Sequence, residues 1–221
     1  MNMPDTKTVL AGLWFAVCSS AISSALAQAE ANDLQRLDSL LQGIETLAAD
    51  VVQLIVEADG GVLEESKIRM YLKKPDGFYW ETFTPFPELI VTNGSLLWNY
   101  QPDLEQVVIE AWDSSRSELA AQLLSGRTDN LAAEYLIEAV SSAADEHQEF
   151  KLTPLATDSI YVEISINFLL SELDMIYLDN KSGQQTVWRF QNVIRNRDLD
   201  DALFEFQPPA GVEVIENTYS Q

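Results

Sequence analysis

Residues 73–106 have the sequence KKPDGFYWETFTPFPELIVTNGSLLWNYQPDLEQ, in which turn signals alternate with short segments rich in aromatic residues. Asn93-Gly94 is the strongest kind of short hairpin signal, and Pro and Gly residues mark further turns on either side of it. The segments between the turns have the length and composition of β-strands; they are residues 77–83, 89–92, 95–100 and 105–112. Strands so close in sequence pair with their neighbours, so this stretch predicts an antiparallel meander.

The meander carries more aromatic surface than a single strand needs for packing. Phe78 and Trp80 are two residues apart and share one face of their strand, as do Trp98 and Tyr100, whereas Tyr79 points to the opposite face. Core packing is the simplest interpretation of any one of these rings. Aromatic surface on both faces is natural when one face joins the core and the other lines a ligand-sized groove.

Upstream of the meander, the pattern predicts a helix and a hairpin. Leucine and isoleucine at helical spacing indicate a helix that Asn32 or Asp33 can cap and that stops at Gly43. A segment with strand character follows, then a hairpin turn at residues 59–61 and an alternating strand at residues 66–72.

Downstream, residues 114–133 predict one or two helices inserted between strands, before strand patterns resume. These later strands are expected at about residues 135–141, 149–155, 159–168, 173–179 and 185–195, and a brief helical turn is expected near residues 199–203. The chain therefore predicts one α+β domain with a large antiparallel sheet. A sheet of about ten strands curls strongly, so it must close into a barrel or be covered on its concave face.

Composition restricts the partners of this domain. The 221 residues, 47% of them hydrophobic, suffice for one domain with a sizeable core. The formal net charge of -22 argues against nucleic acid and against anionic lipid headgroups, since both attract basic surfaces. The acidity suits a protein that must not adhere to membranes, or one that lives in a salty medium.

The N-terminus has the features of a secretory signal. Residues 1–27 contain Lys7, an apolar or small stretch and the small-x-small ending Ala25-Leu26-Ala27, which predicts a signal peptide and a mature domain at residues 28–221. A membrane anchor is the alternative, but serines interrupt the apolar run. Cys18 lies inside the signal with Val17 before it, a poor fit to lipid attachment, so the mature chain is expected to lack cysteine.

Catalytic motifs are nearly absent, so the chain is not predicted to be an enzyme, and no cofactor or metal is expected. His147 is the only histidine and lies in a polar run, as surface histidines do. Without cysteine or a second histidine, catalytic triads and zinc sites lack their parts. A glycosidase-type carboxylate pair that includes Glu81 stays open as an alternative.

Several blocks of the sequence resemble one known family. KKPDGFYWE (73–81), ELIV (88–91), NG (93–94), LLW (96–98) and PDLEQ (102–106), together with the tail FEFQPPAGV (204–212), closely resemble the motifs of the periplasmic outer-membrane lipoprotein carrier protein (LolA) family. The order of signal peptide, helix, meander, inserted helices and second meander also matches. The resemblance covers essentially the whole mature chain.

The resemblance implies an incomplete, open antiparallel β-barrel whose helices form a lid over a hydrophobic cavity. It implies a periplasmic chaperone that binds the acyl chains of triacylated lipoproteins and acts without hydrolysing anything. An inner-membrane ABC transporter would release the cargo, and an outer-membrane lipoprotein receptor would accept it. Nucleic acid is not an expected partner, and the carrier is expected to be a monomer.

The resemblance also assigns site residues. Phe78 matches a first-strand phenylalanine of the family that bears on cargo handling, and hydrophobic positions of the acyl-chain path match Trp80, Leu89, Val91, Leu97 and Trp98. Lys74 stands where the family usually has an arginine that holds the lid through backbone carbonyls, and lysine lacks the planar guanidinium fork. Lys73 and Lys74 are alternatively a simple exposed turn pair.

Two other functions fit a chain of this kind. A cavity protein of similar fold can act as a sensor or as the outer-membrane receptor. The receptor is lipid-anchored, so that function would require an acylated Cys18. A secreted carbohydrate-active enzyme would use tryptophan faces and paired carboxylates, and glycan binding would reveal it.

Overall fold

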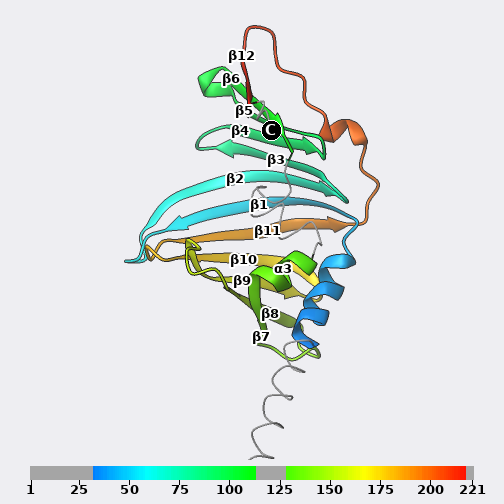
Figure 1. Ribbon diagram of the computed structural model, residues 1–221, viewed down its shortest axis with the longest axis vertical. Coiled ribbons are helices and arrows are strands. Elements are labelled where there is room, and N and C mark those ends of the chain that lie inside the picture. Colours follow the sequence, from blue (N-terminus) through cyan, green and yellow to red (C-terminus); the bar gives the residue numbers. More distant parts are fainter. Residues whose placement is uncertain (1–31, 113–127, 218–221) are drawn as a thin grey trace, which may run out of the picture.

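The computed structural model describes residues 32–112 and 128–217, and these residues form one large sheet with few helices (Figure 1). The sheet has twelve strands in the order β12-β6-β5-β4-β3-β2-β1-β11-β10-β9-β8-β7. Neighbouring strands are antiparallel, except that β12 runs parallel to β6. Because β12 and β7 stand at opposite ends of this order, the sheet is open and not a closed barrel.

The strands follow the predicted pattern closely. Their bounds are β1 (Thr46–Val56), β2 (Val62–Lys73), β3 (Gly77–Thr84), β4 (Glu88–Asn93), β5 (Leu96–Gln101), β6 (Gln106–Ala111), β7 (Tyr135–Ala139), β8 (His147–Pro154), β9 (Tyr161–Leu169), β10 (Glu172–Asn180), β11 (Gln185–Arg195) and β12 (Glu213–Asn217). Residues 32–42 are helical, and the other helical elements are α3 (Thr128–Glu134) and the short 3-10 turns η1 (Pro102–Leu104) and η2 (Asp201–Phe204). The predicted signal peptide, Cys18 and the first inserted helical piece lie outside the described residues.

The prediction of an open antiparallel sheet with few helices is confirmed, but the sheet has twelve strands where about ten were expected. The unpredicted strand is β12, which follows the turn residues Pro208, Pro209 and Gly211. Its partner, β6, precedes it by about half the chain, and the two run parallel. Parallel pairing needs a long connection, so no local hairpin signal marks this strand.

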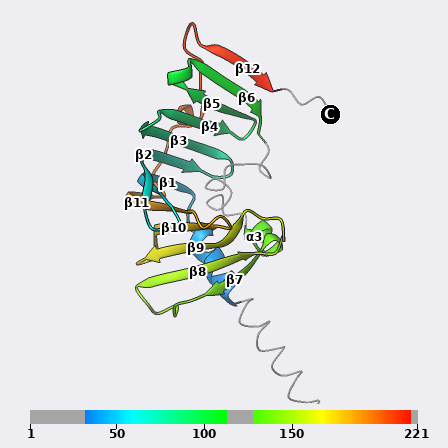
Figure 2. The same ribbon diagram turned by 90° about the vertical axis from the view of Figure 1, so that its left-hand side faces the viewer.

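Each face of the sheet is covered by a different part of the chain. One face, called the inner face here, packs against helix 32–42 and α3, whose buried residues Leu37, Leu41 and Leu131 belong to the main hydrophobic core. Figure 2 shows the curved sheet from the side, with the β1–β6 half above and the helices beside the β7–β11 half. The opposite face, called the outer face, is covered over β3–β6 by the C-terminal segment 199–212, which includes η2.

Helix 32–42 is attached to β7 and β8 by polar contacts. Nη2 of Arg36 donates to the carbonyl oxygen of Ser141 at 3.0 Å, and the guanidinium lies 5.3 Å from the centre of the Phe150 ring. Asp33, one of the two expected caps, is itself helical, and its carboxylate accepts a hydrogen bond from the backbone N–H of Ala139 at 2.9 Å. The helix therefore joins the β7–β8 edge of the sheet through both a cation–π contact and hydrogen bonds.

The other end of this helix is attached to β11. The side-chain oxygen of Asn196 accepts from the backbone N–H of Glu45 at 2.8 Å, and its nitrogen donates to the carbonyl oxygen of Gly43 at 2.9 Å. Asn196 has a left-handed backbone with φ 57°, a conformation that asparagine tolerates better than most residues. One side chain thus fixes the link between the helix and β1.

The Asn-Gly hairpin lies where the sequence indicates. The side-chain oxygen of Asn93 accepts from the backbone N–H groups of Ser95 and Leu96, at 2.9 and 3.1 Å. Gly94 has φ 88°, and a Cβ atom at this position would lie 2.7 Å from Cβ of Asp76. Glycine is therefore required both by the backbone conformation and by the close approach of the preceding turn. This turn sets β5 beside β4.

Candidate functional site

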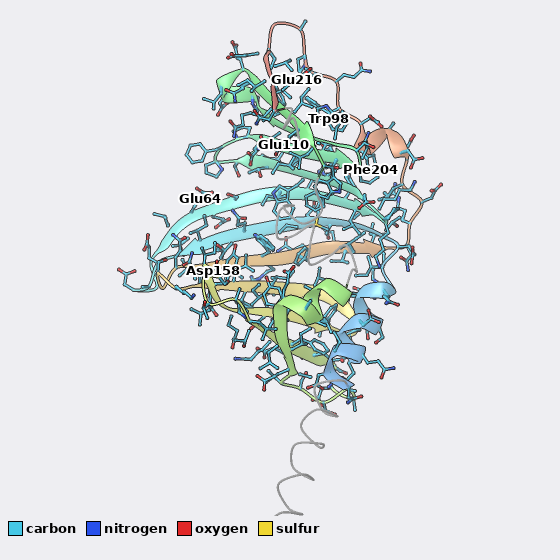
Figure 3. The ribbon with its side chains drawn as sticks, in the orientation of Figure 1. Glu64, Trp98, Glu110, Asp158, Phe204 and Glu216 are labelled. Carbon is cyan, nitrogen blue, oxygen red and sulfur yellow. The ribbon has the colours of Figure 1, made fainter. Side chains whose placement is uncertain are left out.

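The inner face carries a pocket of about 330 Å³ between β1–β4 and β11. Its wall is mostly aromatic, its rim is polar, and its residues come from five strands and from the β3–β4 connection. They are Gln53, Glu64, Ser66, Phe78, Trp80, Thr82, Phe86, Glu88, Ile90 and Trp188. The side chains around this region of β2 and β3, with Glu64 labelled, are drawn in Figure 3.

Three buried rings form the aromatic wall. The Phe78 and Trp80 rings are stacked with their centres 6.0 Å apart, and the Trp80 and Trp188 rings meet edge to face at 5.6 Å. The edge-to-face pair is favourable because the positive edge of one ring meets the negative face of the other. Stacked rings are favourable when they are offset, because their negative faces then do not lie directly over each other. Nε1 of Trp188 donates to the side-chain oxygen of Gln53 at 2.7 Å, which satisfies its only donor. The three rings thus pack on one another, and the indole N–H of Trp188 is already hydrogen-bonded within the protein.

The rim of the pocket differs from its wall. Phe86, in the β3–β4 connection, is 70% exposed, which is unusual for a phenylalanine. Glu64 accepts from the hydroxyl of Ser66 at 2.8 Å. Glu88 accepts from the side-chain amides of Asn99 and Gln101, at 3.0 and 3.2 Å. The pocket therefore combines an apolar interior with an exposed ring and two fixed carboxylates.

The strand register divides the six expected path residues between the two faces. Phe78 lies opposite Thr92, and Thr92 lies opposite Leu97, so Phe78 and Leu97 share the inner face with Trp80. Residues directly opposite each other in a pair project to the same side of the sheet. The other three, which lie on the outer face, are Leu89, Val91 and Trp98. Only Phe78 and Trp80 line the pocket itself.

The three outer-face residues belong to a second hydrophobic cluster. Val91, Trp98 and Val107 are its buried centre, and Phe206 and Val212 of the C-terminal segment pack against it. The C-terminal segment therefore covers the cluster that contains the three outer-face residues.

Tyr79 and Glu81 also lie on the outer face. The hydroxyl of Tyr79 donates to the carboxylate of Glu81 at 2.9 Å, and burial, reinforced by this bond, raises the pKa of Tyr79 above its usual value. Glu81 is opposite Leu89 in the β3–β4 pair. The carboxylate proposed for a glycosidase pair therefore does not face the aromatic pocket.

Lys74 reaches the carboxyl end of helix 32–42. Its Nζ donates to the carbonyl oxygens of Leu41 and Gln42, at 2.9 and 3.4 Å. Burial lowers the pKa of Lys74 from its ordinary value, although Glu45 and Asp38 oppose the shift. A cation at a helix C-terminus also complements the helix dipole. Lys74 thus contacts backbone carbonyls of a helix, the kind of contact expected from the family's arginine.

Lys73 makes different contacts and is not a free surface residue either. Its Nζ donates to the carbonyl oxygen of Leu199 at 2.8 Å and to the carboxylate of Asp201. The hydrogen bond with Asp201 raises the pKa of Lys73. The two adjacent lysines therefore attach different parts of the chain, the N-terminal helix and the C-terminal segment, to the same β2–β3 corner.

We expect Lys74→Ala to loosen the attachment of helix 32–42. Two hydrogen bonds to the helix carboxyl end disappear, which should lower the free energy of unfolding by about 1–2 kcal/mol. Amide hydrogen exchange in residues 37–44 should accelerate, as mass spectrometry of peptic fragments can measure. Lys74→Arg should restore slow exchange. Lys73→Ala is the matched control, and equal acceleration in that variant would show that Lys74 has no special role.

Some residues of the pocket were not predicted as site residues. Trp188 lies on β11 and Gln53 on β1, 135 residues apart in sequence, and only the β1–β11 pairing brings them together. Alternation within residues 185–195 places Trp188 and Phe190 on one face, but it does not indicate which strand lies beside them.

The described residues contain no candidate metal-binding cluster. Within residues 32–112 and 128–217, no group of three or more His, Cys, Asp or Glu side chains is arranged to hold a metal ion. His147 is exposed at the start of β8. None of the helices in these ranges has the length and apolar character needed to cross a membrane.

Comparison with known proteins identifies the family. The family model described as outer membrane lipoprotein carrier protein LolA matches residues 42–207. The outer-membrane lipoprotein carrier protein of Chromohalobacter salexigens is 33% identical over 189 residues, covering 86% of this chain and 89% of that protein. The protein of the same name from Azotobacter vinelandii is 35% identical over 199 residues, covering 89% of this chain and 95% of its own.

A solved structure shows the same fold at much lower sequence identity. The crystal structure of an uncharacterized conserved protein from Thermus thermophilus superimposes with a TM-score of 0.54 at 15% identity, covering 84% of this chain and 97% of that chain. The relatives and the family model both span most of the sheet that carries the pocket. The chain therefore belongs to the LolA family of outer membrane lipoprotein carrier proteins.

Proposed function

We propose that this protein is a periplasmic carrier that binds the acyl chains of lipoproteins released from the inner membrane and delivers them to a receptor at the outer membrane. The observation that carries the proposal is the aromatic pocket on the inner face of a LolA-family sheet. Relatives at about one-third identity bear the name of lipoprotein carriers. The proposed activity is binding and transfer, without a chemical step.

The energetics explain why such cargo needs a carrier. Three acyl chains contain about 45 methylenes, and at ~0.8 kcal/mol for each buried methylene their exposure to water costs on the order of 35 kcal/mol. The pocket of about 330 Å³ is at the lower end of the range for small-ligand sites. To bind all three acyl chains, more of the inner face must therefore become accessible. Helix 32–42 and α3 are the described elements that cover the inner face.

We further propose that Phe78, Trp80 and Leu97 line the cargo path, because they share the inner face. Leu89, Val91 and Trp98 instead support that surface from the outer side, under the C-terminal segment. Lys74 holds helix 32–42 in the closed position, because its hydrogen bonds to the carbonyl oxygens of Leu41 and Gln42 must break before that end of the helix can move away from the sheet.

Cargo transfer requires partners on both membranes. An inner-membrane ABC transporter supplies the lipoprotein, and a lipid-anchored outer-membrane receptor offers a more favourable site. The carrier works as a monomer, and residues 1–27 direct its export to the periplasm. Transfer without hydrolysis by the carrier itself requires that cargo is bound tightly enough to stay soluble and loosely enough to leave.

A release assay tests this function directly. Spheroplasts that accumulate newly made lipoproteins are incubated with the purified mature protein, and the supernatant is examined by native mass spectrometry. We expect a one-to-one complex of the protein with an acylated lipoprotein. A clean ligand-free mass, together with no release of lipoprotein above that caused by an unrelated acidic protein, would contradict the carrier function.

A further inference from the structure

The aromatic pocket on the inner face has an acidic rim that acyl chains do not require. Glu64 on β2 and Glu88 on β4 line the pocket beside Trp80, Trp188 and Phe86. Figure 3 marks Glu64 near the end of β2 that leads to the β1–β2 hairpin. A site for methylenes alone would be served better by apolar rim residues, because carboxylates next to an apolar surface lose hydration when that surface is covered.

Within residues 32–112 and 128–217, both carboxylates are oriented by neutral donors, and no basic side chain is paired with either. Glu64 accepts from the Ser66 hydroxyl, and Glu88 accepts from the amides of Asn99 and Gln101. The salt bridges of this part of the chain do not include Glu64 or Glu88, and its residues that line the pocket include no Lys or Arg. The same network leaves Oδ1 of Asn99, another acceptor, buried without a donor.

Aromatic rings, together with carboxylates that no basic side chain of the described residues neutralises, favour one kind of ligand group. The faces of tryptophan and phenylalanine rings carry negative potential and attract ammonium ions, and carboxylates form charge-assisted hydrogen bonds with the same ions. A phosphate or carboxylate group would instead be repelled by both features. The rim can therefore discriminate between head groups while the wall accepts the chain.

We propose that this pocket binds an alkylammonium group, meaning a protonated amine carried next to an acyl chain. The inference rests on the proposed carrier function and narrows it, because it specifies the chemistry of the group beside the acyl chains. Two sources supply this chemistry. One is an acylated lipoprotein, through a lysine close to the lipidated cysteine, or through the free α-amino group of a cysteine that carries two acyl chains and lacks the third, amide-linked chain. The other is a phospholipid with an ethanolamine head group.

Simple amphiphiles measure the head-group preference. Binding of dodecylammonium and of dodecanol, which have the same chain and differ in charge, is measured by isothermal titration calorimetry on the mature protein at about 150 mM NaCl, where exposed charges are largely screened, and below micelle formation. We expect dodecylammonium to bind about tenfold more tightly than dodecanol, as a desolvated cation–π contact plus one charge-assisted bond provides. Equal affinities would overturn the inference.

A matched pair of double variants separates the pocket from the overall acidity of the chain. Glu64→Gln/Glu88→Gln keeps the hydrogen-bond acceptors and removes two charges from the rim. Glu213→Gln/Glu216→Gln removes two charges from exposed positions of β12, at the far end of the strand order. Only the first variant should lose the preference for dodecylammonium. An equal loss in both, or none in either, would mean that the rim does not recognise the cation.

Two further comparisons identify the source of the amine. A dipalmitoylated cysteinyl peptide without lysine is compared with its N-acetylated form, and phosphatidylethanolamine is compared with phosphatidylglycerol. A preference for the free amine confined to the peptide pair assigns the subsite to cargo, and one confined to the lipid pair assigns it to phospholipid. Dodecanol binding also separates a failure of the ammonium preference from a failure of the carrier function. If dodecanol binds without an ammonium preference, only this inference fails; if neither amphiphile binds, the proposed carrier function fails with it.

Discussion

Phe78→Glu is expected to remove cargo binding and to destabilise the protein strongly. Phe78 is only 3% exposed and stacks on Trp80 in the pocket wall. A carboxylate placed there has no cation to pair with among the described residues of the pocket, so the free energy of unfolding should fall by about 3–5 kcal/mol. Native mass spectrometry after the spheroplast assay should show no lipoprotein bound to the folded variant.

Loss of folding and loss of binding must be distinguished for this position. Phe78→Leu keeps an apolar side chain and should cost roughly 1 kcal/mol of stability, so it should fold and retain most cargo binding. Phe83→Glu is the matched charge control, since Phe83 lies on the same strand but is 40% exposed beside Arg69. If Phe83→Glu abolished cargo binding as completely as Phe78→Glu, the effect would come from added charge and not from the pocket.

Trp98→Ala is expected to have the second largest effect, but on stability alone. Trp98 is 6% exposed in the outer-face cluster, where Val91 and Val107 are its buried neighbours. Deleting a buried indole leaves a large cavity, so the free energy of unfolding should fall by about 3–5 kcal/mol. The acyl-chain path on the inner face should keep its shape, because the sheet separates the two clusters.

The measurement compares urea unfolding with cargo occupancy in the fraction that stays folded. At a temperature where Trp98→Ala is still folded, its affinity for dodecanol should match that of the unchanged protein within about twofold, which is about 0.4 kcal/mol. Phe206→Ala, which opens the same cluster from the C-terminal segment, should behave similarly but more mildly. A Trp98→Ala protein that is stable yet unable to bind would place Trp98 on the cargo path, as the sequence first suggested.

Local patterns were sufficient to predict most of the fold. The alternation of polar and apolar residues predicts the strands, and Asn93-Gly94 and the glycine turn at residues 59–61 predict hairpins between strands that are adjacent in sequence. All of these elements are present. The strand β12 was missed because its partner is distant in sequence. The position of β11 beside β1 was likewise not predictable from either strand alone.

The candidate site was predicted less completely, and the reason is strand register. Alternation correctly grouped Phe78 with Trp80, and Trp98 with Tyr100, but it could not relate one group to the other. That relation depends on the connection from β3 to β4, which contains Pro85 and Pro87 and has no standard hairpin signal. A shift of one residue in this connection would exchange the two faces. Only the observed pairing of Phe78 with Thr92 decides the matter.

The pairing of β1 with β11 has a consequence for how the molecule folds. β1–β6 and β7–β11 are two runs in which each strand pairs with the next along the chain, so each run can form through short loop closures. The junction between them joins Gln53 to Trp188 across 135 residues, and the loop entropy of this closure must be overcome before its contacts contribute. The rate-limiting step of folding is therefore expected to be the association of two preformed meanders. Since Trp188 reaches Trp80 only through this junction, the complete aromatic wall appears at that step.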